Sequence, residues 1–206
     1  MTLDEARDFY CDMIELLIKE YDFDSFLEKR QQDTWDEWYE SHYDCFPQFM
    51  SRCFFEHGMT KAVIGDSMTG YIIKIPFANL KNNYCEWEVK NYKAAVERGL
   101  EECFAWCDKL ETFHHVPIYI MEYAECNEED FDCYVSETYP ELAEEYNGMC
   151  SDEDCVDCVL EEEWGSEIWN AFLDLADDMG ITDRHGGNIG KIDGKYVLVD
   201  YSGYFG

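Results

Sequence analysis

Apolar side chains recur at helical spacing through the first fifty residues of the chain. Thr2 and Glu5 have the spacing of a helix capping box, and apolar residues follow at every third or fourth position. A second helix is predicted from Phe23 to Gln31, and a short third one around Trp35. Because the region has aromatic stripes and no chemical motif, we interpret residues 1–50 as an N-terminal helical region whose aromatic side chains form core.

The pattern changes to that of β-strands at Ser51. Short apolar runs are separated there by Gly, Pro and polar residues. Residues 51–124 are predicted to form a small antiparallel sheet with one helix. Residues 100–113 are ambiguous, although their spacing suits a helix. The predicted elements are a hairpin over residues 52–64, a third strand over 71–75, a helix from Asn83 toward Gly99, and a buried strand over 116–121.

The remaining residues, 125–206, begin with an acidic insertion and end with a predicted hairpin. Residues 125–163 hold the densest acid but also enough aromatic residues to argue against disorder. An amphipathic helix is predicted from Trp164 to Met179, ended by Gly180. Two short strands follow, Asn188–Lys191 and Tyr196–Val199, joined by an Asp193-Gly194 turn. The chain is therefore predicted to be an α+β protein.

Composition limits the broad class of protein. The chain has 206 residues, of which 17% are aromatic, so it is long enough for a real core. It contains no run of 18 apolar residues, and its first residues do not resemble a signal peptide. We therefore expect a soluble, cytoplasmic protein of one domain or two tightly joined lobes, with no membrane partner.

The net charge of the chain limits its possible binding partners. Forty-seven acidic residues face fifteen basic ones, which gives a formal net charge of −32. Such a field repels nucleic acid and anionic membranes, and it attracts basic partners. Two explanations stay open. The charge either keeps the protein in solution, or it imitates a phosphate backbone and occupies the basic, nucleic-acid-binding groove of another protein.

Eleven cysteines raise the question of metal binding. In a chain without a secretory segment, most are expected to be small buried apolar residues rather than disulfides. Cys155 and Cys158 have CxxC spacing, and Cys150 lies just before them. The three could begin a zinc site, but no second CxxC follows, so whether they bind zinc stays open.

The chemistry-bearing residues gather near the end of the chain. Asp183 is followed five positions later by Asn188, and Asp200 closes the second predicted strand. The hairpin can bring the amide oxygen of Asn188 and the carboxylate of Asp200 onto one hard divalent cation. Asp183 lies just upstream, where it can orient a nucleophile. A simpler interpretation is that these residues only cap turns.

This constellation resembles that of the kinase-like phosphotransferases, in which an Asp, an Asn and a second Asp serve phosphoryl transfer. The order Asp183-Arg184-His185 and the ending Asp200-Tyr-Ser-Gly are most similar to the phosphatidylinositol 3- and 4-kinase branch and to small kinase-like proteins of phages and bacteria. The resemblance implies ATP and Mg²⁺ as cofactors, with Asn188 and Asp200 as metal ligands. It also implies Asp183 as the base. His185 and Arg184 would either stabilise the transferring group or shape the loop.

The resemblance extends to the predicted sheet. Lys74 lies inside an apolar strand, Ile72-Ile73-Lys74, which is similar to the strand whose lysine contacts nucleotide phosphates in that family. Glu88 is predicted to pair with Lys74, ahead of Glu86. The resemblance further implies that Gly58 lies in the phosphate-covering loop. It also implies that backbone groups from Glu122 to Ala124 meet an adenine ring, with Met121 behind it.

The sequence departs from the kinase-like pattern in several ways. The usual Asp-Phe-Gly triplet is replaced by Asp200-Tyr-Ser-Gly, in which the glycine comes one residue late. The phosphate-covering loop keeps only one glycine, and the chain has no activation segment or substrate-binding helices after Asp200. The expected fold is thus a truncated protein-kinase-like fold. Two functions follow: a magnesium-dependent phosphotransferase from ATP to an unknown acceptor, or a non-catalytic acidic inhibitor, such as a phage-type anti-defence protein, that mimics nucleic acid on a kinase-like scaffold.

Overall fold

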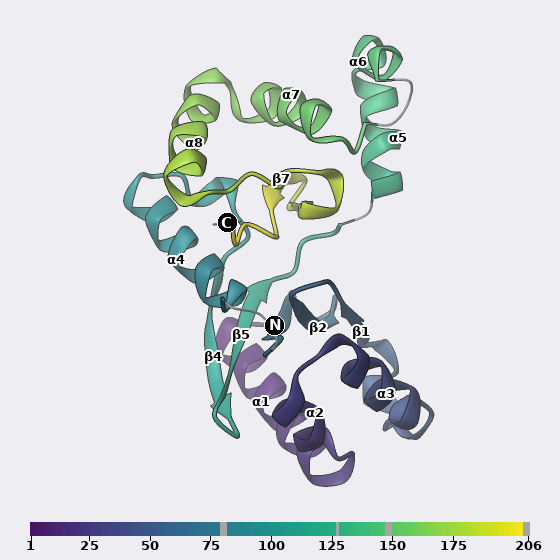
Figure 1. Cartoon of the computed structure of the whole chain (residues 1–206). Helices are drawn as coiled ribbons and strands as arrows, with labels where there is room; N and C mark the ends of the chain where they lie inside the picture. Colours follow the sequence, from purple (N-terminus) through teal and green to yellow (C-terminus); the bar gives the residue numbers. More distant parts are fainter. Residues whose placement is uncertain (79–81, 127, 147–149, 204–206) are drawn as a thin grey trace. The chain divides into compact units, whose positions relative to one another are not determined.

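The computed structural model describes residues 1–78, 82–126, 128–146 and 150–203 (Figure 1). The chain is an α+β protein that forms two compact units. The first unit comprises residues 1–89 and 107–123, and the second comprises residues 90–106 and 124–206. The boundary between them falls inside one helix, α4 (Tyr84–Glu97), after Val89.

The first unit is built on a five-stranded antiparallel sheet with the strand order β1-β2-β3-β5-β4. Residues 100–113, which the sequence leaves ambiguous although their spacing suits a helix, contain a short 3-10 turn followed by strand β4. Residues 107–109 and 111–113 pair with β5, with a shift of register between them, and this pairing makes the segment a strand. The strands are β1 (Phe54–His57), β2 (Lys61–Asp66), β3 (Tyr71–Pro76), β4 (Cys107–Phe113) and β5 (Val116–Glu122).

The strand register divides the sheet into two faces. Ile64 of β2, Ile73 of β3 and Ile120 of β5 pair in one row, and each is fully buried. Because side chains alternate along a strand, the neighbouring row points the other way. That second row holds Lys74, which pairs with Val63 on one side and with Tyr119 on the other.

The N-terminal helices cover the isoleucine face of the sheet. Tyr10 of α1 donates a hydrogen bond to the carbonyl of Tyr71 at the start of β3. Trp35 and Trp38 of α3 pack their rings against Phe55 of β1, which pairs with Ile64. Residues 1–50 therefore belong to the core of the first unit rather than to a separate region. These helices are α1 (Leu3–Glu20), α2 (Phe23–Lys29) and α3 (Gln32–His42).

The second unit surrounds a short hairpin with helices (Figure 1). Asp193 and Gly194 both have positive φ, at 50° and 81°, as the predicted two-residue turn requires. Leu198 at the end of β7 is fully buried and accepts a hydrogen bond from the backbone of Ala105. The elements are α5 (Glu128–Thr138), α6 (Pro140–Glu145), α7 (Glu153–Trp164), α8 (Ser166–Met179), β6 (Ile189–Ile192) and β7 (Lys195–Leu198).

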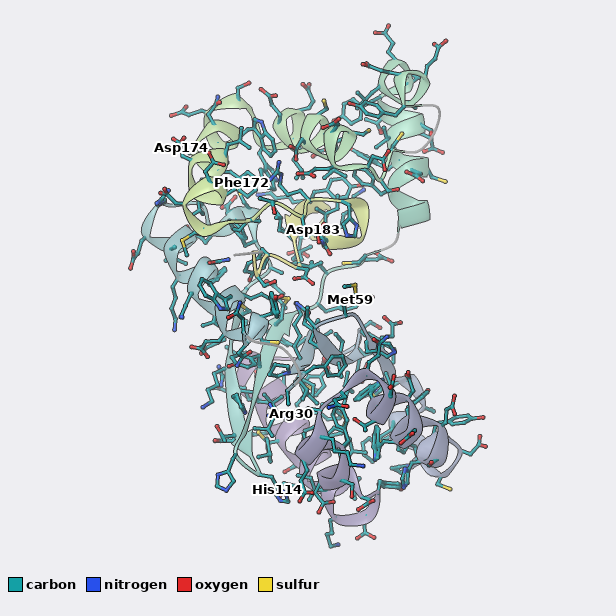
Figure 2. The ribbon with its side chains drawn as sticks, in the orientation of Figure 1. Arg30, Met59, His114, Phe172, Asp174 and Asp183 are labelled. Atoms are coloured by element: carbon teal, nitrogen blue, oxygen red, sulfur yellow. The ribbon has the colours of Figure 1, made fainter. Side chains whose placement is uncertain are left out.

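Helix α8 differs from the predicted amphipathic helix at its beginning. Gly165, with φ 81°, separates α7 from α8, so Trp164 ends one helix instead of starting the next. Trp169 and Phe172 are then buried, whereas Ile168 is 44% exposed. Figure 2 shows Phe172 and the exposed Asp174 on opposite sides of α8. The predicted end of the helix at Gly180 is correct, and Gly180 adopts the left-handed conformation.

The unit boundaries differ from the three predicted ranges 1–50, 51–124 and 125–206. Residues 90–106 lie between two elements of the sheet unit in sequence but pack in the second unit. Phe104 places its ring 4.9 Å from that of Tyr201 and 5.8 Å from that of Phe172. These contacts join residues far apart in sequence, so no local pattern indicates them. No helix within the described ranges combines the length and apolar character needed to cross a lipid bilayer.

Candidate functional site

Lys74 and Glu88 form a buried ion pair in the first unit. Lys74 Nζ lies 3.0 Å from Glu88 Oε1 and donates a second hydrogen bond, at 3.2 Å, to Oε2. Lys74 is 4% exposed and Glu88 is 1% exposed. The carboxylate contacts the ammonium group with both oxygens, which holds the lysine side chain extended from β3 toward α4. This is the ion pair that the sequence predicts.

The start of α4 is fixed by a separate group of hydrogen bonds. The side chain of Asn83 accepts from the backbone of Glu86 and caps the helix. The hydroxyl of Tyr119 donates to Glu86 at 2.7 Å and accepts from Asn83 at 2.8 Å. Glu86, the weaker candidate partner of Lys74, thus binds Tyr119. Its role is to anchor the helix that carries Glu88.

In the second unit, hydrogen bonds of Asn188 link the three predicted loop residues. The Nδ2 atom of Asn188 donates to the backbone carbonyl of Asp183 at 2.8 Å. The backbone carbonyl of Asn188 accepts from Val199 at 2.9 Å and from Asp200 at 3.5 Å. The β6–β7 hairpin makes these contacts, because Asn188 precedes β6 and Asp200 follows β7. Since its amide nitrogen binds the loop, only Oδ1 of the Asn188 side chain can serve as a metal ligand.

Asp200 is held in place by the residues that follow it. The hydroxyl of Ser202 donates to Asp200 Oδ1 at 3.3 Å. Tyr201 is 1% exposed, donates to the carbonyl of Ala105 at 2.6 Å and accepts from Asn91 at 2.6 Å through its own carbonyl. The segment after β7 is therefore anchored by a buried tyrosine, which fixes the position of the Asp200 backbone.

Gly203 has a packing role in the same segment. Its φ is +73°, and a Cβ atom there would lie 2.7 Å from the carbonyl oxygen of Met179 and 2.8 Å from that of Gly180. A side chain would clash with the backbone at the end of α8. The close approach explains why a glycine stands three residues after Asp200.

His185 lies beside Asp183 in the loop. The backbone N–H of Gly187 donates to Nδ1 of His185 at 3.0 Å, so the neutral imidazole carries its proton on Nε2. Nε2 lies 3.7 Å from Oδ1 of Asp183. Both side chains are between 42% and 44% exposed, so solvent can reach them. In this arrangement the imidazole of His185 can orient the carboxylate of Asp183.

Arg184 has a structural role. Its guanidinium donates two hydrogen bonds of 2.7 Å to the carboxylate of Asp157 on α7, and it lies 3.1 Å from Glu153. The hydrogen bonds to Asp157 raise the pKa of Arg184 above its usual range. Of the two roles that the sequence leaves open, the geometry favours shaping the loop, because the Nε and Nη2 edge of the guanidinium joins the loop to α7.

A close backbone contact completes the support of this loop. The N–H of Gly186 donates to the carbonyl of Ser151 at 2.7 Å. A Cβ atom at Gly186 would lie 2.7 Å from Cβ of Ser151 and 3.1 Å from its Cα. The loop can therefore approach the segment before α7 only with glycine at this position.

The other predicted residues divide between the two units. Gly58 lies in the exposed β1–β2 turn, and Met121, which is 1% exposed, and Glu122 lie at the end of β5 in the first unit. Ala124, which is 6% exposed, begins the last part of the second unit, where the adjoining Glu125 pairs with Lys191 of β6. Lys74 and Glu88 are thus brought together in one unit. Asp183, His185, Asn188 and Asp200 are brought together in the other.

Sequence reasoning missed two functional contacts, those of Lys61 and Asp157. Lys61 Nζ lies 2.5 Å from Glu88 Oε1, and Asp157 binds Arg184. Lys61 opens an apolar strand, Lys61-Ala-Val-Ile, so it shares the signal that singled out Lys74. Asp157 is one of many acids in its region, and nothing in the sequence separates it from them.

The cysteines do not form a metal centre in the part of the chain that the structure describes. Cys150 and Cys155 are buried, Cys158 is exposed, and no group of three or more His, Cys, Asp or Glu residues there could hold a metal ion. The possibility of zinc at these three cysteines is therefore not supported among the described residues.

Thiol labelling at about pH 8 is expected to separate the cysteines by burial, because the thiolate is the reactive form. Burial raises the pKa of Cys103 and of Cys155 to about 12, so almost none of either is ionised until the pH approaches that value. Peptide mass spectrometry should find both protected in the folded protein and labelled in urea. Rapid labelling of Cys103 in the folded protein would contradict the structure. The exposed cysteines Cys45, Cys126 and Cys133 are expected to react first, whereas Cys158 is also exposed but has a pKa raised by burial.

The chain matches no protein-family model, and a search of curated proteins finds no match either.

Proposed function

We propose that this chain is a kinase-like, magnesium-dependent phosphotransferase that moves a phosphoryl group from ATP to an acceptor. The main support is the linkage of Asp183, Asn188 and Asp200 by hydrogen bonds within one loop and hairpin. A second support is the buried pair of Lys74 with Glu88 on a sheet with strand order β1-β2-β3-β5-β4. Turn capping alone does not require a buried lysine–glutamate pair as well.

Asn188 and Asp200 carry donor atoms of the kind that a magnesium ion prefers. Mg²⁺ prefers hard oxygen ligands and is usually held by one or two carboxylates together with the phosphates of its substrate. Asp200 provides a carboxylate and Asn188 Oδ1 provides an amide oxygen, and the hairpin brings the two residues together. Bound at these two residues, the ion would neutralise charge on the phosphate chain.

The remaining residues have separate roles in the transfer. Lys74, kept extended by Glu88, donates to phosphate oxygens, which offsets part of the repulsion between an anionic nucleotide and this acidic chain. Asp183 accepts the proton of the acceptor hydroxyl as that oxygen bonds to the γ-phosphorus of ATP, while the bond from this phosphorus to the bridging oxygen breaks and ADP leaves. His185 positions Asp183, and Arg184 positions the loop through Asp157.

Calorimetry with ATP, in magnesium and in EDTA, tests this function. Wild-type protein is expected to bind ATP more tightly in magnesium, and Asp200→Asn is expected to lose most of that difference because the negative charge of the carboxylate ligand is gone. Asp174→Asn is the matched control, since it makes the same change of charge on the exposed side of α8. Equal affinity in magnesium and EDTA for the wild type, or equal behaviour of both variants, would contradict the proposal.

A second candidate function is supported by charge. The exposed sides of α7 and α8 carry carboxylates with few cations between them, among them Glu162, Glu167 and Asp177. An acidic binding protein that occupies a basic groove would use such surfaces. It would bind its partner equally well in EDTA, with an affinity that falls as salt rises, and it would show no magnesium-dependent binding of ATP. The calorimetric result therefore separates the two functions.

A further inference from the structure

Glu88 is shared by two lysines. Lys61 Nζ lies 2.5 Å from Oε1 of Glu88, and Lys74 Nζ lies 3.0 Å from the same atom. Lys61 and Lys74 are each 4% exposed. Because both ammonium groups contact one oxygen atom, they can be no farther apart than the sum of these two distances. Two cations are therefore gathered at one place in a chain whose net charge is −32.

The strand register explains how Lys61 reaches this position. Val63 of β2 pairs with Lys74 of β3, and Lys61 is two residues before Val63, so all three side chains lie on one face of the sheet. This face is opposite to the one that the N-terminal helices cover. Lys61 also directly follows the β1–β2 turn, in which Met59 is 79% exposed (Figure 2). The lysine pair thus lies next to a turn that is open to solvent.

We propose that Lys61 is a second phosphate-binding residue, which forms with Lys74 a two-lysine site for a chain of at least two phosphoryl groups. This inference rests on the proposed function, in which Lys74 contacts the phosphates of ATP. Glu88 holds the ammonium groups close together but on separate strands, so adjacent phosphoryl groups can each meet one of them.

The β1–β2 turn gives a reason for a second lysine. Gly-rich loops bind phosphates through several backbone N–H groups, and their glycines allow the backbone to approach. This turn has Gly58 as its one glycine, and the N–H of Gly58 donates to the carbonyl of Lys61 at 3.0 Å. That N–H therefore closes the turn. Charge from Lys61 replaces binding that a Gly-rich loop would supply through its backbone.

If Lys61 had a purely structural role, its replacement would have a different effect on ligand binding. Lys61 would stabilise the fold through Glu88, and its loss would affect every ligand alike. A phosphate-binding Lys61 makes affinity depend on the number of linked phosphoryl groups. Inorganic pyrophosphate and orthophosphate separate these cases, because neither contains a nucleoside and both can be studied without magnesium.

The test is calorimetry of the full chain with pyrophosphate and with orthophosphate, in EDTA. Wild-type protein is expected to bind pyrophosphate at least about tenfold more tightly than orthophosphate, and Lys61→Met is expected to weaken pyrophosphate binding about tenfold or more, as loss of one charge-assisted hydrogen bond predicts. Lys93→Met, the same change at an exposed position on α4, should leave the affinity unchanged. Lys61→Arg, which keeps the charge, should retain most of it.

Three outcomes would overturn the inference: no binding of pyrophosphate to the wild type, equal affinity for the two anions, or equal behaviour of the Lys61 and Lys93 variants. The anion comparison needs only the wild type, so it holds even if Lys61→Met does not fold. Failure of the proposed function looks different. In that case magnesium does not strengthen ATP binding, whatever the pyrophosphate result.

Discussion

Replacing Glu88 by alanine is expected to lower the free energy of unfolding by about 3–5 kcal/mol, the range found when one partner of a buried ion pair is removed. Glu88 is 1% exposed, and two buried lysines, Lys61 and Lys74, contact its carboxylate. The substitution leaves their ammonium groups without that carboxylate. Alanine favours helix at least as well as glutamate, so the loss would not come from α4 itself.

Urea denaturation of the wild type and three variants checks this expectation. Glu97→Ala, at the exposed end of the same helix, is the control and should change stability by no more than about 0.5 kcal/mol. Glu88→Gln keeps the size of the side chain and its hydrogen-bonding oxygen, so it should fall between the two. If Glu88→Ala were as stable as Glu97→Ala, the ion pair would have no structural importance.

The largest expected effect on activity belongs to Asp183→Asn. If Asp183 accepts the proton of the acceptor, its loss should lower turnover about 10²- to 10⁴-fold, the usual contribution of a general base. Hydrolysis of ATP, with water as the acceptor, provides the measurement while the natural acceptor is unidentified. Affinity for ATP in magnesium should stay close to that of the wild type, because Asn188 and Asp200 are unchanged.

The control for this experiment is again Asp174→Asn, which should keep wild-type turnover. Asp183→Asn preserves the size of the side chain, and the hydrogen bond from Asn188 reaches the backbone of residue 183, so the loop keeps its support. Turnover within about tenfold of the wild type would exclude Asp183 as the base. Loss of ATP binding in this variant would instead give Asp183 a role in holding the metal.

Much of the candidate site follows from local sequence. Asp183, Asn188 and Asp200 lie within eighteen residues, and the Asp193-Gly194 turn alone sets the hairpin that joins the last two. To predict that Lys74 pairs with Glu88, one must also know which side of α4 packs against the sheet. Helical periodicity ranked Glu88 above Glu86, and the structure places Glu88 on Lys74.

Other features of the structure could not be predicted from local sequence patterns. Asp157 binds Arg184, which is 27 positions away in the sequence. No sequence signal distinguishes Asp157 from the many acidic residues around it. Residues 107–113 form a strand because β5 pairs with them, although their spacing also suits a helix. In both cases the deciding contact comes from a partner outside the local segment.

The sequence by itself determined the elements whose signals are short in range: the capped first helix, the β6–β7 turn, the end of α8 at Gly180, and the grouping of Asp183, Asn188 and Asp200. Only the tertiary structure decided that residues 90–106 pack with the second unit and that Lys61 shares Glu88 with Lys74. The physical reason is that caps and turns depend on a few neighbouring residues. The position of Lys61 depends instead on the register between two strands and on a helix that follows later in the chain.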